Sequence, residues 1–343
     1  MSPRKFFPPF SPTAGRTSAA GTFLSCQSPL GTSSRLQAGP GETAALITRV
    51  FSWRPRPRTL LAITIVYLAI ASALLIYRRM VITPDYLFVL LLPIAYLSGR
   101  FLSFVKDWVP FMALLLGWEA MRGVAPLLGM PVHNGNLFME RRIFDDHLPT
   151  LVLQNLLDHG LLGRVVDYAS AVVYLCHFPV TLGVAVALWI VSRQQFLRYV
   201  ATLLGMSMGA FVFCLLVPTA PPWYASDQGL ITGMKHVLSY TLPSNLSAYF
   251  SALNPNPVAA LPSLHAAFAF LGFLAVSKLF PRARIAMFVW CLAVWFSVVY
   301  LGEHYVLDVV AGVALAAVSW RLSGWVAAVK PGSVRSLAPE SAG

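Results

Sequence analysis

The chain has 343 residues, of which 57% are hydrophobic and only 11% are charged, and its mean hydropathy is +0.68. This composition excludes an ordinary soluble domain and indicates a polytopic membrane protein. The formal net charge of +12 is therefore divided between the two sides of a membrane, and no nucleic-acid partner is expected. The four cysteines lie in apolar runs and in the N-terminal tail, a pattern that predicts neither a disulfide framework nor a cysteine metal site.

The N-terminal segment differs in composition from the rest of the chain. Residues 1–58 are rich in Ser, Pro, Gly and Thr, and Glu42 is their only acidic residue. No apolar stretch precedes Leu60, so the sequence predicts no secretory signal peptide. We interpret this segment as a disordered basic tail, with an Arg- and Ser-rich organelle transit peptide as the alternative. A second disordered tail is predicted over residues 327–343.

Apolar runs occupy most of the remaining chain, and each is close to the ~20 residues that a helix needs to cross a bilayer. The sequence therefore predicts an all-α integral membrane protein with about eight transmembrane helices. The two long connections, residues 130–166 and 218–262, exceed the length of plain connectors and are predicted to form interfacial outer loops. The predicted spans are residues 60–77, 86–105, 109–129, 167–191, 198–217, 263–280, 284–302 and 305–326.

Two polar segments stand at the boundaries of the last three apolar runs. The first is Pro262-Ser263-Leu264-His265, and the second runs from Tyr300 to Asp308 and contains His304. Ionisable groups at a membrane boundary are costly unless they are paired or used. Pro262 and Ser263 predict a capped helix N-terminus, where free backbone N–H groups favour a phosphate. Ser263 is therefore also a candidate for substrate binding.

His304 and Asp308 are four residues apart, so on a helix they share a face. If Asp308 accepts the Nδ1 proton of His304, Nε2 is free as a nucleophile or base, and His265 can serve as the general acid. The alternatives are a capped helix with a surface histidine at His265, an interfacial ion pair of His304 and Asp308, and a His/His/Asp metal site. His177, in the middle of the fourth predicted span, is interpreted as a buried core histidine.

These segments resemble the motifs of the type 2 phosphatidic acid phosphatase superfamily. The second family motif, P-S-x-H, is matched in full by residues 262–265. The third motif, S-R-x5-H-x3-D, is matched at Ser297, His304 and Asp308, but Val298 replaces its arginine. The resemblance implies that His304 is the nucleophile, that His265 protonates the leaving group, and that catalysis needs no metal ion or other cofactor.

One branch of that superfamily, which contains inositol phosphorylceramide synthases and related bacterial proteins, is more similar still. It often reads Y-L-x-x-H-Y-x-x-D, as residues 300–308 do, and residues 218–223 (Pro-Thr-Ala-Pro-Pro-Trp) also look like it. The resemblance covers roughly residues 110–326. It implies a six-helix catalytic membrane domain over residues 109–326, two accessory helices within residues 59–108, and a bacterial plasma membrane as the location.

A cation for the substrate phosphate is missing from the family positions. The first family motif, K-x6-R-P, is absent from this chain. Arg122, three residues after Glu119 in the third predicted span, is a candidate because a planar guanidinium binds two phosphate oxygens at once. The alternative is that Arg122 and Glu119 only neutralise each other. The competing donors in the outer loops are Arg141, Arg142 and Lys235.

The basic residues also predict the orientation of the chain. With a cytoplasmic N-terminus, the excess of Lys and Arg lies on the inner side, as the positive-inside rule requires. The same orientation puts both histidine motifs at the extracytoplasmic face. The inner residues are Arg54, Arg56, Arg58, Arg100, Lys106, Arg193, Arg198, Lys278, Arg282, Arg284, Arg321 and Lys330, and the outer ones are Arg78, Arg79, Arg141, Arg142, Arg164 and Lys235.

The predicted reaction is phosphoryl transfer from a lipid phosphate or phosphodiester through a phosphohistidine on His304. Water as the acceptor makes the protein a lipid phosphatase, and a hydroxyl makes it a phosphotransferase, which includes inositol-phosphate headgroup transfer. A prenyl-diphosphate phosphatase is an alternative. A non-catalytic lipid carrier that uses the histidines as a proton relay is another, although the sequence has no internal repeat of the kind that many transporters show.

Overall fold

The computed structural model describes residues 56–77, 84–123, 125–157, 159–241 and 256–329. All of them belong to one compact unit, Arg54–Gly343. The tail predicted over residues 1–58 lies almost entirely outside the described residues, as does most of the tail predicted over residues 327–343. Arg54, Arg78, Arg79 and Lys330 also lie outside them.

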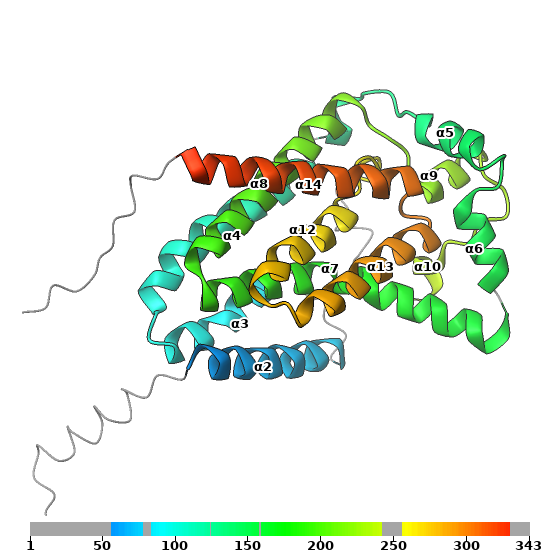
Figure 1. Ribbon diagram of the computed structural model, residues 1–343. Helices are drawn as coiled ribbons and strands as arrows, with labels where there is room; N and C mark the ends of the chain where they lie inside the picture. Colours follow the sequence, from blue (N-terminus) through cyan, green and yellow to red (C-terminus); the bar gives the residue numbers. More distant parts are fainter. Residues whose placement is uncertain (1–55, 78–83, 124, 158, 242–255, 330–343) are drawn as a thin grey trace, which may run out of the picture. The chain divides into compact units, whose positions relative to one another are not determined.

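Regular secondary structure in the described ranges is helical throughout, which confirms the predicted all-α class (Figure 1). Two isolated β-bridges, both at Thr219, are the exception to helical pairing there. The long helices are α2 (Pro57–Tyr77), α3 (Pro84–Leu97), α4 (Phe101–Arg122), α7 (Gly160–Val191), α8 (Arg193–Leu216), α12 (Leu264–Leu279), α13 (Ala283–Tyr300) and α14 (Val306–Val329). The short ones are η1 (Ala125–Leu128), α5 (Gly135–Ile143), α6 (Pro149–Leu157), α9 (Pro222–Asp227) and α10 (Val237–Thr241).

Each predicted span overlaps one of the long helices. Within the described residues, five of these helices are long and apolar enough to cross a membrane: α4, α7, α8, α13 and α14. Shorter apolar stretches occur in α2, α3 and α12. The chain is therefore an integral membrane protein.

The predicted boundary between the second and third spans is wrong. The sequence favoured a break at residues 106–108, whereas the structure breaks the helix at Ser98–Arg100. Gly99 there has φ 64°, a left-handed conformation that glycine adopts without steric cost. Its N–H donates to the carbonyl oxygen of Tyr96 (2.9 Å) and ends α3. Pro110 is accommodated inside α4, where the sequence had suggested a helix start.

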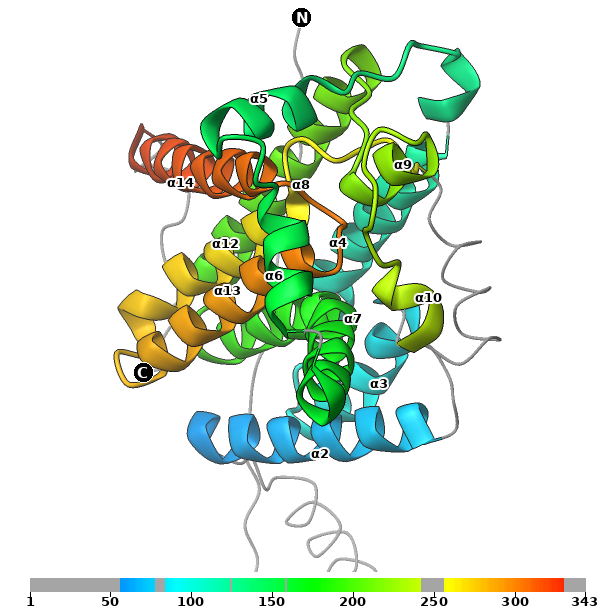
Figure 2. The ribbon, with the colours of Figure 1, turned by 90° about the vertical axis from the view of Figure 1, so that its right-hand side faces the viewer.

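Helix α12 occupies the centre of the packing and contacts α13, α14, α7 and α8 (Figures 1 and 2). Small residues on its buried surface allow these neighbours to approach closely. The closest approach is at Gly312 of α14, where a Cβ atom would collide with the carbonyl oxygen of Ser263. The small buried residues of α12 are Ala266, Ala267, Ala269, Gly272 and Ala275.

Basic and aromatic side chains tie the α3–α4 and α7–α8 junctions together at one end of the packing. Arg193 donates from Nε and Nη2 to the buried carboxylate of Asp107, at 2.5–3.0 Å. The indole N–H of Trp189 donates to the same carboxylate (3.1 Å), and the guanidinium of Arg100 lies 4.8 Å above the Trp189 ring. Arg100 and Arg193, both predicted to be cytoplasmic, are therefore linked through Trp189 and Asp107. Arg198, a third residue predicted to be cytoplasmic, lies further along α8, and its guanidinium is 3.7 Å from the Trp320 ring of α14.

The short helices α5, α6, α9 and α10 gather at the other end, on the right in Figure 1 and toward the viewer in Figure 2. They are built from the two connections predicted to be interfacial, residues 130–166 and 218–262. Residues 242–255 of the second connection lie outside the described residues. The starts of α12 and α14 and the end of α13 lie at this end, so it carries both histidine motifs.

Candidate active site

The predicted capped N-terminus is present at the start of α12. The Ser263 hydroxyl accepts a hydrogen bond from the Ala266 N–H (3.4 Å), and the Ser263 N–H donates to the Asp308 carbonyl oxygen (3.0 Å). These bonds fix the beginning of α12 against the beginning of α14. Ser263 is fully buried, and its side chain caps α12.

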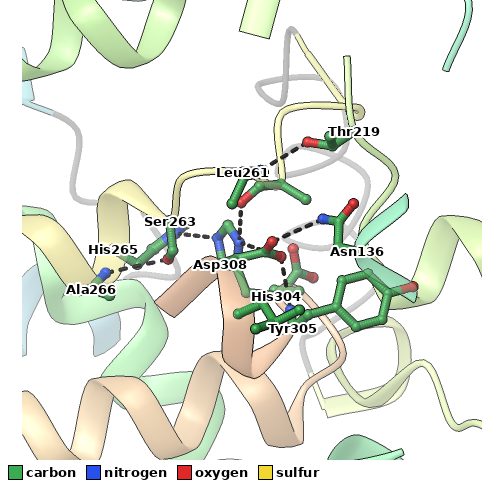
Figure 3. Close-up of polar contacts among 12 residues, drawn as sticks. Asn136, Thr219, Leu261, Ser263, His265, Ala266, His304, Tyr305 and Asp308 are labelled. Carbon is green, nitrogen blue, oxygen red and sulfur yellow. Dashed lines mark hydrogen bonds and ion pairs between the residues drawn. The ribbon is translucent and has the colours of Figure 1, made fainter. Parts of the chain in front are cut away.

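The structure brings the two predicted histidines into direct contact. His265 Nδ1 lies 3.1 Å from His304 Nε2, and the ring planes are inclined by 62° (Figure 3). The residues are 39 positions apart and come from α12 and from the turn between α13 and α14. A hydrogen-bond distance leaves no space for a phosphorus atom between the two nitrogens.

The predicted acceptor of the His304 Nδ1 proton is wrong. Nδ1 lies 2.9 Å from the carbonyl oxygen of Ala260, whereas the nearer oxygen of Asp308 is 3.7 Å away. A carbonyl oxygen can only accept, so Nδ1 carries the proton and Nε2 of the neutral ring has a lone pair. The sequence predicted that Asp308 would leave the lone pair of His304 Nε2 available. In the structure the Ala260 carbonyl oxygen has this effect instead.

Thr219 holds that carbonyl in place. Its backbone oxygen accepts from the Ala260 N–H (3.2 Å), and its hydroxyl accepts from the Leu261 N–H (2.9 Å; Figure 3). The Thr219 N–H donates to the Val258 carbonyl oxygen (2.9 Å). The Pro-Thr-Ala-Pro-Pro-Trp segment thus positions the main chain at Ala260 and Leu261. The Ala260 carbonyl oxygen in turn orients the His304 ring.

Asp308 is completely buried and is held by two donors. Its Oδ2 accepts from the Tyr305 N–H (2.9 Å), and its Oδ1 accepts from the Asn136 side-chain amide (2.8 Å; Figure 3). This carboxylate lies 3.7 Å from His304 Nδ1. Asn136 belongs to α5, so a helix from the outer connection contributes directly to this site.

A second side chain of α5, Glu140, contacts the beginning of α14. Its Oε2 accepts from the Leu307 N–H (3.3 Å), and the residue is fully buried. Burial raises the pKa of the Glu140 carboxyl group to about 7, against the opposing effect of that hydrogen bond. Asn136 and Glu140 are not predicted as site residues from the sequence, because a polar residue in a connecting segment has no periodic pattern that distinguishes it from a solvated one.

We predict that Asn136→Ala lowers turnover by about 10- to 100-fold, because an unsatisfied buried carboxylate oxygen costs about 1–3 kcal/mol. The measurement is the initial rate of product formation, with thermal unfolding recorded on the same sample. Asn134→Ala is the matched control, because its amide donates to the exposed Gln228 (3.4 Å). Equal rates for the two variants would contradict a role for Asn136 in holding Asp308.

His177 lies closer to the site than the sequence suggested. It is buried, as predicted, with Nδ1 2.6 Å from the Tyr174 carbonyl oxygen. Its ring centroid is nevertheless only 4.2 Å from that of His265, and the Tyr174 ring stacks on His265 at 4.7 Å. A position in the middle of the predicted span therefore does not separate His177 from the two histidine motifs. Pro179 does not interrupt α7, which is continuous over 32 residues.

The candidate phosphate-binding cations have different surroundings. Arg122 donates to Glu119 (2.9 Å), and its charge also acts on His177 and His265. Arg142 is exposed on α5, whereas Lys235 is half-buried and its N–H donates to the Gln154 side chain (2.9 Å). Of the predicted cations, Arg122 has the clearest electrostatic connection to the histidines. Arg141, the other competitor, donates to the Leu230 carbonyl oxygen (2.8 Å).

These features define a polytopic helical membrane protein with a histidine–histidine–aspartate site at one end of its packed helices. Within the described residues, no group of three or more His, Cys, Asp or Glu side chains has the arrangement of a metal site. A model of the PAP2 superfamily matches residues 139–322, which is more than half of the chain, and the protein belongs to this superfamily. The matched range lies inside the catalytic domain predicted over residues 109–326.

Three curated relatives are similar over part of their length. Phosphoinositol dihydroceramide synthase of Bacteroides thetaiotaomicron is 28% identical over 173 residues, covering 46% of this chain and 55% of the relative. The inositol phosphorylceramide synthase catalytic subunit of Schizosaccharomyces pombe is 29% identical over 165 residues, covering 44% of this chain and 39% of the relative. Inositol phosphorylceramide synthase of Candida albicans is 26% identical over 196 residues, covering 52% and 39%. The chain therefore spans about half or less of the length of these relatives. No solved structure matches it significantly.

Proposed function

We propose that the protein transfers a phosphoryl group, with or without a headgroup attached, from a membrane lipid phosphate or phosphodiester through a covalent intermediate on His304. The observation that carries the proposal is the alignment of His304: Nδ1 bonded to a carbonyl oxygen and Nε2 directed at His265. The names of the three relatives, all synthases of inositol phosphosphingolipids, support a lipid phosphotransferase. Ceramide-type lipids are accordingly the first acceptors to test.

The proposed first step is attack of His304 Nε2 on the phosphorus. The bond from phosphorus to the lipid alcohol breaks, and His265 gives its proton to the departing oxygen. In the second step an acceptor hydroxyl attacks the phosphohistidine, its proton passes to His265, and the phosphorus–nitrogen bond breaks. Asp308 stabilises the positive charge that His304 acquires.

The resting geometry adds a condition to this mechanism. Since the two reacting nitrogens are 3.1 Å apart, the substrate phosphate has to separate the His265 and His304 rings when it enters. The N-terminus of α12 offers backbone N–H groups and a partial positive charge to that phosphate. We propose Arg122 as the side-chain cation, in the place of the arginine that Val298 replaces in the family motif.

We expect Arg122→Lys to lower kcat/KM by about 10- to 100-fold, because an ammonium group cannot reproduce a bidentate guanidinium contact. The measurement is the rate of lipid-phosphate turnover as a function of substrate concentration. Arg142→Lys, at an exposed position of α5, serves as the comparison. Unchanged kinetics for Arg122→Lys would leave Arg122 as the partner of Glu119 alone.

We also propose that the site faces away from the cytoplasm. The α3–α4 and α7–α8 junctions, which carry Arg100 and Arg193, lie at the opposite end of the packing from the start of α14 (Figure 1). Arg198 contacts Trp320 in the second half of α14. An excess of basic residues is typical of the cytoplasmic side. A membrane-impermeant reagent applied to intact cells should therefore label a cysteine introduced at Asp227, which is exposed beside the site; labelling only after lysis would place the site on the other face.

The experiment that tests the function uses the purified full-length protein in lipid nanodiscs. Radiolabelled phosphatidic acid, phosphatidylinositol and a prenyl diphosphate are supplied with and without a ceramide, and the products are identified. We expect a transferred or released phosphate group and an acid-labile protein adduct. Lipid movement across the bilayer without any product would instead support the carrier.

A further inference from the structure

The turn between α13 and α14 carries a carboxylate that the proposed mechanism does not use. Glu303 immediately precedes His304, and both of their N–H groups donate to the Val298 carbonyl oxygen (3.0 and 3.1 Å). Gly302 turns the chain with φ 77°, and its carbonyl oxygen accepts from the Trp223 N–H (3.0 Å). The position of Glu303 is thus set by the same turn that presents the nucleophile.

The Glu303 carboxylate contacts an aromatic residue that packs against the histidines. The Tyr174 hydroxyl donates to Oε2 (3.4 Å), and the Tyr174 ring in turn stacks on His265. Burial raises the pKa of the Glu303 carboxyl group to about 7, against the lowering effects of the His304 charge and of the Tyr174 and Trp223 side chains.

The chemistry of this group suits a hydroxyl ligand better than a phosphate. An ionised carboxylate has about four acceptor sites and no donor, so the hydrogen bond from Tyr174 leaves capacity for more. It repels phosphate oxygens, which are attracted instead to Arg122 and to the N-terminus of α12. Glu303 is only half-buried, and Trp223 and Tyr224 pack edge to face beside it (5.6 Å). The Glu303 carboxylate is therefore an acceptor for hydroxyl groups, with aromatic rings next to it.

We propose that Glu303 binds hydroxyl groups of a polyol attached to, or accepting, the transferred phosphate. This inference rests on the proposed function and deepens it, because it names the ligand class that binds at the turn presenting His304. The polyol has two possible sources: the headgroup of a phosphodiester lipid, or a free polyol that attacks the phosphohistidine.

The experiment compares lipids that differ only in their hydroxyl groups. Full-length protein in nanodiscs receives phosphatidylinositol or phosphatidylethanol, and release of diacylglycerol is measured; a second arm supplies phosphatidic acid with free inositol. For the wild type we expect kcat/KM for phosphatidylinositol to exceed that for phosphatidylethanol by at least about tenfold. Glu303→Gln should reduce this ratio to about threefold or less, and Glu303→Asp should retain most of it. If Glu303→Gln loses inositol phosphate formation in the second arm while the ratio between the two lipids is unchanged, the free polyol is the ligand.

The matched control is Asp227→Asn, which removes an exposed carboxylate of α9 that pairs with His236 (3.3 Å). It should keep the wild-type ratio. If Glu303→Gln changes neither the preference for phosphatidylinositol nor inositol phosphate formation in the second arm, the inference is overturned even when phosphohistidine forms. If no lipid yields product and no adduct forms on His304, the proposed function fails and the inference fails with it.

Discussion

Replacement of His304 by asparagine is expected to abolish lipid turnover, with a loss of at least about 10⁴-fold in kcat, as for other nucleophiles that form covalent intermediates. The reason is geometric. His304 Nε2 is the nitrogen whose lone pair is left available by the Nδ1 bond to Ala260, and asparagine has no nucleophilic nitrogen at that position. The measurement is single-turnover product formation together with trapping of the acid-labile adduct.

Two controls accompany the His304→Asn experiment. His147→Asn removes an exposed imidazole from the outer connection, where Nδ1 lies 2.8 Å from the Asp145 carbonyl oxygen, and it should retain wild-type turnover. Monodisperse elution and an unchanged unfolding temperature of His304→Asn would show that the variant inserts and folds. Turnover that persists in His304→Asn would remove this residue as the nucleophile.

The second large effect is expected from a single methyl group, in Gly312→Ala. The added Cβ would collide with the Ser263 carbonyl oxygen and lie 3.1 Å from the Ser263 carbonyl carbon and 3.4 Å from the Ala267 nitrogen. All of these are backbone atoms at the N-terminus of α12, so no flexible side chain can yield. Helices α12 and α14 must separate, and overpacking of this kind costs about 1–3 kcal/mol.

The consequence for activity should be larger than the consequence for stability. His265 moves with α12, while Asp308 belongs to α14, and a displacement of about 1 Å at a reacting group can cost ~100-fold in rate. Turnover and thermal unfolding of Gly312→Ala are to be compared with those of Gly209→Ala on α8, where a Cβ would meet no atom within 4 Å. If both substitutions are equally well tolerated, the close approach of α12 and α14 does not control the site.

Much of the fold follows from hydropathy alone. The apolar runs are long because backbone polar groups in a bilayer must be satisfied within the helix, and this requirement leaves a strong compositional pattern. The error at the α3–α4 junction has a definite cause. Leu97 and Phe101 flank Gly99 closely, so the run remains apolar on average, and one residue with positive φ is sufficient to end a helix.

The reacting groups were also visible in the sequence, because Ser263, His265, His304 and Asp308 occur at short, motif-like spacings. Their supporting contacts were not. Asn136 and Glu140 come from a connection more than 160 positions before α14, and His177 reaches His265 from another helix. Pairings between distant segments depend on how helices pack, which local patterns do not specify.

Hydropathy and motif spacing are sufficient to predict a helical membrane protein and to select His265, His304 and Asp308 as candidate reacting groups. The folded arrangement is needed to show that the Ala260 carbonyl oxygen, and not Asp308, accepts the His304 Nδ1 proton. The physical reason is that every residue has a carbonyl group, so its chemistry leaves no mark in the sequence. Its position is set by hydrogen bonds that the Ala260 and Leu261 N–H groups donate to Thr219, some 40 residues away, and it exists only once the chain has folded.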